Sequence, residues 1–218
     1  MVKPNICLSL GDLSFDTINV LLKEVNMAEI RIDLLNLMPE ELNELFAKHK
    51  NLIATCRPGR FDEEERAILL ERALVHGAAY IDLEIETLPE WRAPLIKLAA
   101  DLNRKVIVSY HDFDGTPGDE DLDRIVGSLW DAGAHVAKVA CMALTMADSA
   151  RIMNLYSKHS NLVAIAMGKF GTITRVAAPM LGAPFTFASV KGKITAPGQL
   201  DYQTLEEAIR IIEPKVNE

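Results

Sequence analysis

Residues 79–112 read AYIDLEIETLPEWRAPLIKLAADLNRKVIVSYHD, and this stretch decides the fold. The β-rich segments Ala79–Glu86 and Lys105–Asp112 lie on either side of a helical pattern at Pro89–Leu102. This order of elements is typical of a βαβ unit, so we expect the two strands to be parallel.

The same alternation of strand and helix repeats from end to end of the chain. Strands are predicted over Ile6–Leu10, Ala28–Leu34, Asn51–Cys56, Ala79–Glu86, Lys105–Asp112, His135–Ala143, Leu162–Gly168 and Pro184–Val190. Helices are predicted over Phe15–Val25, Pro39–His49, Asp62–His76, Pro89–Leu102, Asp119–Ala132, Met146–His159, Thr172–Leu181 and Tyr202–Ile212. Eight such repeats predict an α/β fold, a (β/α)8 TIM barrel, formed by a single domain over residues 1–218. The alternative, a doubly wound open sheet, usually has a Gly-rich first turn, which residues 11–14 (GDLS) do not supply.

Composition excludes several classes of protein. The 218-residue chain is 49% apolar and 25% charged, as in an ordinary soluble globule. A net charge of −8 disfavours binding to nucleic acid or to an anionic membrane, and no apolar run approaches the ~18 residues that span a bilayer. The first ten residues show no secretory signal, and the cysteines at 7, 56 and 141 form no CxxC pair. We therefore expect a reduced, cytoplasmic protein without a structural zinc, a membrane segment or a nucleic-acid partner.

Four of the predicted strands carry polar side chains at every second position, although buried parallel strands are usually apolar on both faces. The polar residues that share a face are Glu29, Arg31 and Asp33; Thr55 and Arg57; Asp82, Glu84 and Glu86; and Ser109 and His111. In a barrel they point inward or into the mouth, where polar groups need partners. One interpretation is an interior salt-bridge network of Glu29, Arg31, Asp33, Asp82 and Glu84. The other, favoured because four adjacent strands end in this way, is a functional site at the carboxyl-terminal mouth.

The sharpest single signal is Lys138, which lies within the apolar segment HVAKVAC at residues 135–141. Lysine is rarely buried without a partner. Burial disfavours its charged form and frees the amine as a nucleophile, which a Schiff-base enzyme needs. The alternative is a structural lysine that Asp82 or Glu84 neutralises. Of the two, the nucleophile is the favoured interpretation.

His111 is the one histidine that closes a predicted strand at the mouth of the barrel. This position makes it the candidate general acid–base partner of Lys138, one strand away. The alternative is a core histidine bonded to Ser109. The other histidines are assigned to helix ends (His49, His76 and His159) or to the opposite end of the barrel (His135).

Two glycine-containing segments follow the last two predicted strands. Residues 168–172, GKFGT, are a weak candidate for a phosphate-binding loop. Residues 191–199, KGKITAPGQ, are long enough for a mobile lid, although their composition alone favours a plain surface loop.

In this order the motifs resemble the type I 3-dehydroquinate dehydratase family of the shikimate pathway. The family's active-site signature is similar to residues 82–85 (DLEI), a spacer of twenty residues (86–105) and residues 106–112 (VIVSYHD). Further segments that resemble the family are Glu29–Asp33, Thr55–Pro58, Ala137–Ala140, Met167–Arg175 and Ala196–Gln199. The resemblance covers nearly the whole chain. It implies a lyase of chorismate and aromatic amino acid biosynthesis that needs no metal or organic cofactor and forms a homodimer.

The resemblance also implies a role for each site residue. Lys138 would form an imine with the C3 ketone of 3-dehydroquinate, and His111 would take a proton from C2 and later protonate the departing C1 hydroxyl. This syn elimination of water yields 3-dehydroshikimate. The substrate-binding residues that it implies are Arg175, Thr195 and Gln199 for the carboxylate, and Glu29, Arg31 and Arg57 for the ring hydroxyls.

The chain departs from the family pattern at two places. Thr195 stands where the family usually has serine, so the hydroxyl is kept. The loop after Arg57 is shortened and lacks the acidic residue that would orient the catalytic histidine from that position. We expect Glu84, on the strand beside His111, to take over this orientation.

Two other functions fit parts of the sequence. A class I aldolase or transaldolase acting on a phosphosugar also uses a barrel lysine, but it would need a phosphate site after the last two strands. A catalytically silent barrel that binds a small acid would not need a lysine, a histidine and three arginines facing one cavity.

Overall fold

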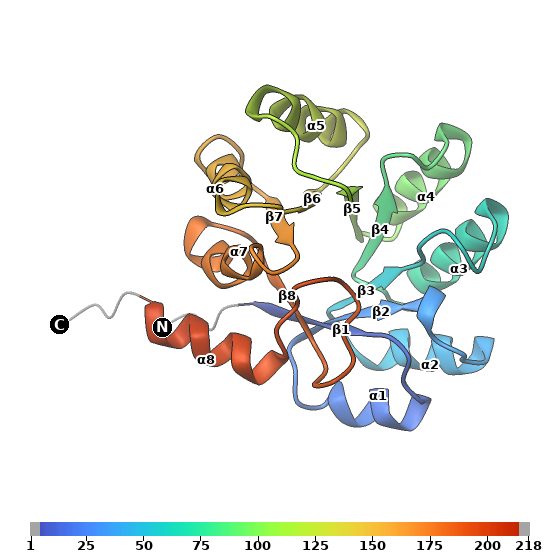
Figure 1. Cartoon of the computed structure of the whole chain (residues 1–218). Coiled ribbons are helices and arrows are strands. Elements are labelled where there is room, and N and C mark those ends of the chain that lie inside the picture. The colour runs from blue at the N-terminus through green and yellow to red at the C-terminus, as the bar shows by residue number, and fades with distance from the viewer. Residues whose placement is uncertain (1–4, 214–218) are drawn as a thin grey trace.

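The computed structural model describes residues 5–213, which form eight parallel strands surrounded by helices (Figure 1). The strands are β1 (Ile6–Leu10), β2 (Met27–Arg31), β3 (Leu52–Thr55), β4 (Tyr80–Glu84), β5 (Lys105–Asp112), β6 (Val136–Met142), β7 (Leu162–Met167) and β8 (Thr186–Ser189). Hydrogen bonding follows the order β7-β6-β5-β4-β3-β2-β1-β8, so the sheet curls into a nearly closed barrel. The predicted (β/α)8 TIM barrel is confirmed.

A helix follows each strand and packs on the outside of the barrel (Figure 1). The helices are α1 (Phe15–Leu21), α2 (Pro39–Lys48), α3 (Glu63–His76), α4 (Pro89–Asp101), α5 (Asp119–Asp131), α6 (Met146–Asn154), α7 (Thr172–Ala177) and α8 (Tyr202–Ile212). Local signals set their ends. For example, the Asp62 side chain accepts a hydrogen bond from the Glu65 N–H at the start of α3, and Gly77, with φ 118°, ends that helix in the left-handed region.

Apolar side chains form separate cores on the two faces of the barrel wall. The larger core fills the space between strands and helices. A second core closes the amino-terminal half of the barrel interior and includes Met27, Ile53, Ile107, Val163 and Phe187. Because side chains alternate along a strand, the next inward positions on β2, β3 and β5 belong to Glu29, Thr55 and Ser109. A polar layer therefore lies directly above an apolar floor, at the carboxyl ends of the strands.

Two predicted strands end earlier than the period-two pattern suggests. β2 stops at Arg31, and Ile32–Leu34 form a 3₁₀ helix in which the Asp33 carboxylate turns back onto the Arg31 guanidinium. β4 stops at Glu84, and Glu86 is exposed. Asp33 and Glu86 therefore do not share the inward strand faces to which the sequence assigned them. Arg57 likewise lies beyond the end of β3.

Three helices also end four or more residues earlier than predicted. α1 stops at Leu21, and α6 stops at Asn154, so His159 lies beyond it and pairs with Asp123 at 3.0 Å. In the third, α7 gives way to a 3₁₀ turn over Ala178–Leu181. Pro179 has no N–H to donate to the Arg175 carbonyl, which accepts from the Thr186 hydroxyl at 2.9 Å instead. No helix within residues 5–213 is long and apolar enough to cross a membrane.

Candidate active site

A cavity of about 320 Å³ opens in the polar layer at the carboxyl ends of the strands. All nine side chains predicted to act in the site line it: Glu29, Arg31, Arg57, Glu84, His111, Lys138, Arg175, Thr195 and Gln199. These residues are spread over 171 positions of the chain, from 29 to 199, and the barrel brings them together. Its other lining residues are Pro58, Phe113, Ala140, Ile165, Met167, Phe187 and Ala196.

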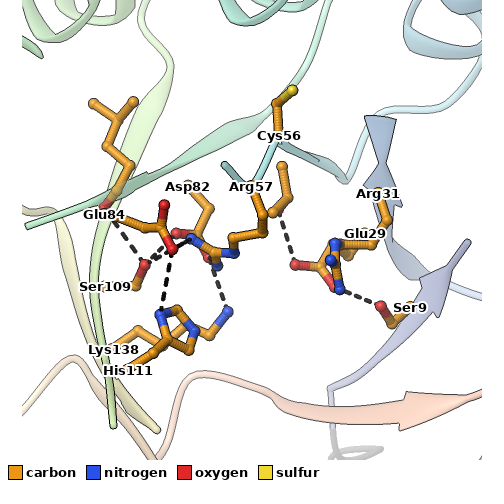
Figure 2. Close-up of polar contacts among 12 residues, drawn as sticks. Ser9, Glu29, Arg31, Cys56, Arg57, Asp82, Glu84, Ser109, His111 and Lys138 are labelled. Carbon is orange, nitrogen blue, oxygen red and sulfur yellow. Dashed lines mark hydrogen bonds and ion pairs between the residues drawn. The ribbon is translucent and has the colours of Figure 1, made fainter. Parts of the chain in front are cut away.

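Lys138 lies on β6 and is only 6% exposed. Its Nζ is 2.8 Å from Oδ2 of Asp82, so of the two predicted partners Asp82 is the one in contact. The same oxygen accepts from Nη2 of Arg57 at 2.8 Å, and Oδ1 accepts from Oγ of Ser109 at 2.6 Å (Figure 2). The lysine therefore shares its carboxylate with a second cation, and its Nζ also lies 4.6 Å from the ring centre of Phe187.

Asp82 is a fully buried carboxylate that remains charged. Burial by itself would raise its pKa, but the charges of Arg57 and Lys138 hold that pKa well below its ordinary range. Asp82 is thus the anion that keeps two cations, Lys138 and Arg57, in place at the cavity wall.

His111 points into the cavity from β5, where its ring stacks on Phe113 at 6.1 Å between ring centres. Burial, followed by the positive charges of Arg57 and Lys138, lowers its pKa well below the ordinary value of 6.5. The ring is therefore neutral at pH 7, as a general base must be. The Ser109 hydroxyl bonds to Asp82, so a core histidine bonded to Ser109 is not what the structure shows.

Glu84 is the carboxylate nearest to the imidazole, but the two do not form a hydrogen bond. Its Oε1 lies 3.9 Å from Nδ1 of His111 and 3.6 Å from Nη1 of Arg57. Within residues 5–213, Nδ1 of His111 has no hydrogen-bond partner. The predicted orienting residue is therefore adjacent to His111, about 1 Å beyond a usual hydrogen bond.

Glu29 and Arg31 both lie on β2, but their side chains belong to separate polar clusters. The Glu29 carboxylate accepts from the hydroxyl of Ser9 at 2.5 Å (Figure 2) and from that of Thr55 at 2.8 Å. Arg31 is paired with both carboxylate oxygens of Asp33, at 3.0 and 2.6 Å. The predicted single salt-bridge network is therefore wrong: Arg31 pairs with Asp33, Arg57 pairs with Asp82 and Glu84, and Glu29 accepts from hydroxyls and forms no ion pair within residues 5–213.

Arg175, on α7, is 1% exposed, and within residues 5–213 its guanidinium makes one hydrogen bond, from Nη2 to the Pro197 carbonyl at 3.3 Å. Its buried Nε has no partner, and no ion pair of the part of the chain that the structure describes includes this guanidinium. Burial lowers its pKa to about 10, with Glu29 opposing the shift, so Arg175 is still a cation at pH 7. A buried guanidinium with unused donors is suited to binding a ligand carboxylate.

Residues 191–199 lie against the cavity as a tethered loop. Arg31 Nη1 donates to the Thr195 carbonyl at 3.2 Å, and the Gly168 N–H donates to the Pro197 carbonyl at 3.3 Å. The Gln199 side-chain oxygen accepts from the N–H of Thr195 at 2.8 Å and of Ala196 at 3.1 Å. This leaves the amide nitrogen of Gln199 to donate to a ligand.

Three residues of the site were not singled out as site residues from the sequence. Asp82 was placed on the polar face of its strand and as a possible partner of Lys138 but was given no role in the reaction, and it holds both Lys138 and Arg57. Ser9 bonds Glu29 and lies 2.7 Å from the Thr195 hydroxyl; its polarity within the apolar segment ICLSL was the available signal. Arg66 contacts Glu84 from α3. A charged residue on a helix is common, so the sequence offers no reason to assign Arg66 to the site. Within residues 5–213, no group of three or more His, Cys, Asp or Glu side chains could hold a metal ion.

Together, a buried lysine, a neutral histidine and a buried arginine around one cavity at the carboxyl end of the strands define a (β/α)8-barrel enzyme. Comparisons with known proteins specify the kind of enzyme. The model of the family described as type I 3-dehydroquinase matches residues 7–215. The chain belongs to this family, and the prediction of a 3-dehydroquinate dehydratase, a lyase, is confirmed.

Named relatives and solved structures agree with this assignment. The chain is 36% identical over 200 residues to a 3-dehydroquinate dehydratase of Methanococcus maripaludis, covering 88% of this chain and 90% of the relative. It is 36% identical over 202 residues to that of Methanocaldococcus jannaschii, covering 89% and 90%. The crystal structure of the Geobacillus kaustophilus 3-dehydroquinate dehydratase is similar with a TM-score of 0.84 and 26% identity, over 96% of this chain and 91% of that one. Neither alternative function, the aldolase or the silent barrel, is supported by these matches.

Proposed function

We propose that this protein converts 3-dehydroquinate to 3-dehydroshikimate through an imine on Lys138. The amine attacks the C3 ketone and water leaves, which forms a C=N bond in place of C=O. The protonated imine withdraws electrons and acidifies the neighbouring C2–H. No metal or organic cofactor is required for this activation.

His111 is the base and then the acid of the elimination. Neutral at pH 7, it takes the C2 proton; the C1 hydroxyl then leaves as water with a proton returned by the same ring. Hydrolysis of the product imine releases 3-dehydroshikimate and restores the lysine. Glu84 orients the imidazole from the Nδ1 side, with the shift of about 1 Å that a bound substrate would bring.

The remaining side chains bind the substrate. Arg175 takes the carboxylate, with Gln199 and Thr195 from the loop contributing hydrogen bonds. Glu29, Arg31 and Arg57 bind the ring hydroxyls. Cytoplasmic location and a homodimer stay predictions that rest on the sequence and the resemblance.

One observation carries the proposal: Lys138 and Arg175 line the same cavity, the first beside a neutral histidine and the second without an anionic partner in the described chain. A keto acid is the class of small molecule that satisfies both, because its ketone can react with the amine while its carboxylate pairs with the guanidinium.

Borohydride reduction in the presence of 3-dehydroquinate tests the proposal. Reduction of the imine should add one ligand mass to the peptide that contains Lys138. Lys138→Ala should abolish this labelling while the protein stays folded, because Asp82 keeps Arg57 and Ser109 as partners. Labelling of Lys169 or Lys193 instead of Lys138 would overturn the assignment.

A further inference from the structure

A buried arginine reaches the active site from outside the barrel. Arg66 belongs to α3, yet it is only 5% exposed because its side chain runs inward past the end of β3. Its Nε donates to the Cys56 carbonyl at 2.8 Å, Nη1 to Glu63 at 2.8 Å and Nη2 to Glu84 at 3.1 Å. All three nitrogens of the guanidinium are therefore engaged.

The two carboxylate oxygens of Glu84 face different neighbours. Oε2 is the one that accepts from Arg66, and Oε1 is the one that faces His111 and Arg57. A carboxylate is planar, so fixing Oε2 also fixes the direction of Oε1. The Arg66 guanidinium, itself anchored on the backbone of Cys56, thus determines which way Glu84 presents its free oxygen.

The Nδ1 atom of His111 lies on the same side of Glu84 as Oε1. Nδ1 of His111 is buried without a partner among the described residues, and the carboxylate oxygen closest to it is Oε1 of Glu84, at 3.9 Å. A carboxylate that accepts from Nδ1–H sets the tautomer in which Nε2 is the free base.

We propose that Arg66 is a positioning residue for the dehydration, which holds the Glu84 carboxylate so that it orients His111 with Nε2 toward the substrate. This inference rests on the proposed function. Arg66 does not line the cavity, so it acts through Glu84 and not through a substrate contact.

Charge supports the same arrangement. Burial raises the pKa of Glu84, and the negative charges of Asp82 and Glu86 add to this rise, whereas Arg57 and Arg66 oppose it. Loss of the Arg66 charge would therefore favour a protonated Glu84, which is a poorer acceptor for Nδ1–H.

The experiment measures kcat and KM against pH for Arg66→Met, with Arg66→Lys and Glu84→Gln beside it. Arg66→Met should lower kcat by about 10–100-fold, the size that outer hydrogen-bond partners have for metal-bound histidines, and should change KM little. The acidic limb of its kcat profile should move to higher pH. Arg66→Lys should recover part of the lost kcat, since one positive charge returns.

The matched control is Glu63→Gln, because it removes the half-exposed partner of Arg66 and leaves the Arg66–Glu84 contact in place. Its kcat and pH profile should equal those of the wild type. In the Glu84→Gln background, Arg66→Met should cost no further kcat, because the group that it positions is already changed.

Several results would overturn the inference. Independent losses in the double variant, or a kcat and pH profile of Arg66→Met equal to the wild type, would show that Arg66 only stabilises the fold. If Arg66→Met does not fold, Arg66→Gln decides, because it keeps a hydrogen-bond donor but lacks the charge, and a wild-type kcat and pH profile for it has the same meaning. Failure of the proposed function is a separate outcome, since the wild-type enzyme would then not be trapped on Lys138 by borohydride.

Discussion

His111 combines two features of a catalytic base: a neutral ring at pH 7 and a position on the cavity wall beside Lys138. We expect His111→Ala to be trapped by borohydride on Lys138 but to lose about 10²–10⁴-fold in kcat, the usual effect of a lost acid–base group. Single-turnover kinetics with mass analysis of the adduct would show both. A nearly unchanged kcat would mean that His111 is only a packed ring.

The lowered pKa of His111 makes a prediction about pH. A base must be deprotonated, so activity falls when the pH drops through the pKa of the folded enzyme, and kcat/KM reports the free enzyme. The midpoint of the acidic limb of kcat/KM should lie below 6.5, because burial, Arg57 and Lys138 disfavour the imidazolium. A midpoint at or above 6.5 would contradict this electrostatic account.

Arg175 should contribute more to substrate binding than Gln199 does. Loss of one charged partner from a buried pair costs about 2–5 kcal/mol. Because Arg175 is expected to pair with the substrate carboxylate, Arg175→Ala should lower kcat/KM by well over tenfold. Gln199→Ala should cost less, because a neutral hydrogen bond contributes about 0.5–1.5 kcal/mol. Steady-state kinetics of both variants give the comparison, and equal losses would argue against a carboxylate on Arg175. Removal of Arg175 leaves the Pro197 carbonyl with the Gly168 N–H, so the loop keeps a tether.

At the scale of single residues, the sequence predicted those site residues whose side chains are unusual for their position in a strand. A lysine in an apolar strand and a histidine at a strand end are conspicuous, and both line the cavity. Arg66 could not be found in this way, because arginine on a helix is normally solvated and only the packed structure shows its buried contacts. The separation of Glu29 and Arg31 into two clusters was equally hidden, since it depends on a turn after β2.

At the scale of elements, alternation along the strands was readable because side-chain direction has a period of two. The ends of the elements were less readable, because they depend on single contacts. Asp33 leaves the strand to pair with Arg31, and Pro179 interrupts the helix after α7 while Thr186 takes the freed carbonyl. Pro179 is a local signal that a helix ends, whereas the position of Asp33 depends on the 3₁₀ turn after β2.

The loop over residues 191–199 makes a prediction at this scale. Gly198 has φ 74°, and a Cβ there would lie 2.4 Å from the Gly168 carbonyl oxygen. Gly198→Ala should push the loop off this contact and raise KM by about tenfold, since the clash with the Gly168 backbone adds to the left-handed strain that an alanine at either position would have. Gly192→Ala is the matched control: its φ is 77° but nothing lies within 4 Å of the added Cβ.

Limited proteolysis tests whether this loop is a lid. Cleavage within 191–199 should be slower with ligand bound, and faster in Gly198→Ala than in Gly192→Ala. Equal cleavage with and without ligand would remove the lid, and leave the plain surface loop that the composition favoured.

At the scale of the whole molecule, the polar layer of the barrel interior affects both the stability of the fold and catalysis. The apolar floor closes the barrel, whereas the layer above it holds charges that must be paired to remain buried. Asp82 is the centre of this layer, because its carboxylate is shared by Lys138, Arg57 and Ser109.

Asp82→Asn should therefore destabilise the fold as well as impair catalysis. It would leave the buried Lys138 without a carboxylate partner and Arg57 with only the more distant Glu84, and loss of one partner of a buried pair typically costs about 3–5 kcal/mol in unfolding free energy. The pKa of Asp82 is held well below its ordinary value of 3.8, so the charged carboxylate contributes its full stability above that value and loses it as the pH falls below 3.8. The difference in unfolding free energy between wild type and variant, measured by urea denaturation, should be constant near neutral pH and should shrink as the pH falls below 3.8. A difference that stayed the same down to about pH 2 would mean that the lost stability comes from packing and not from the charge of Asp82.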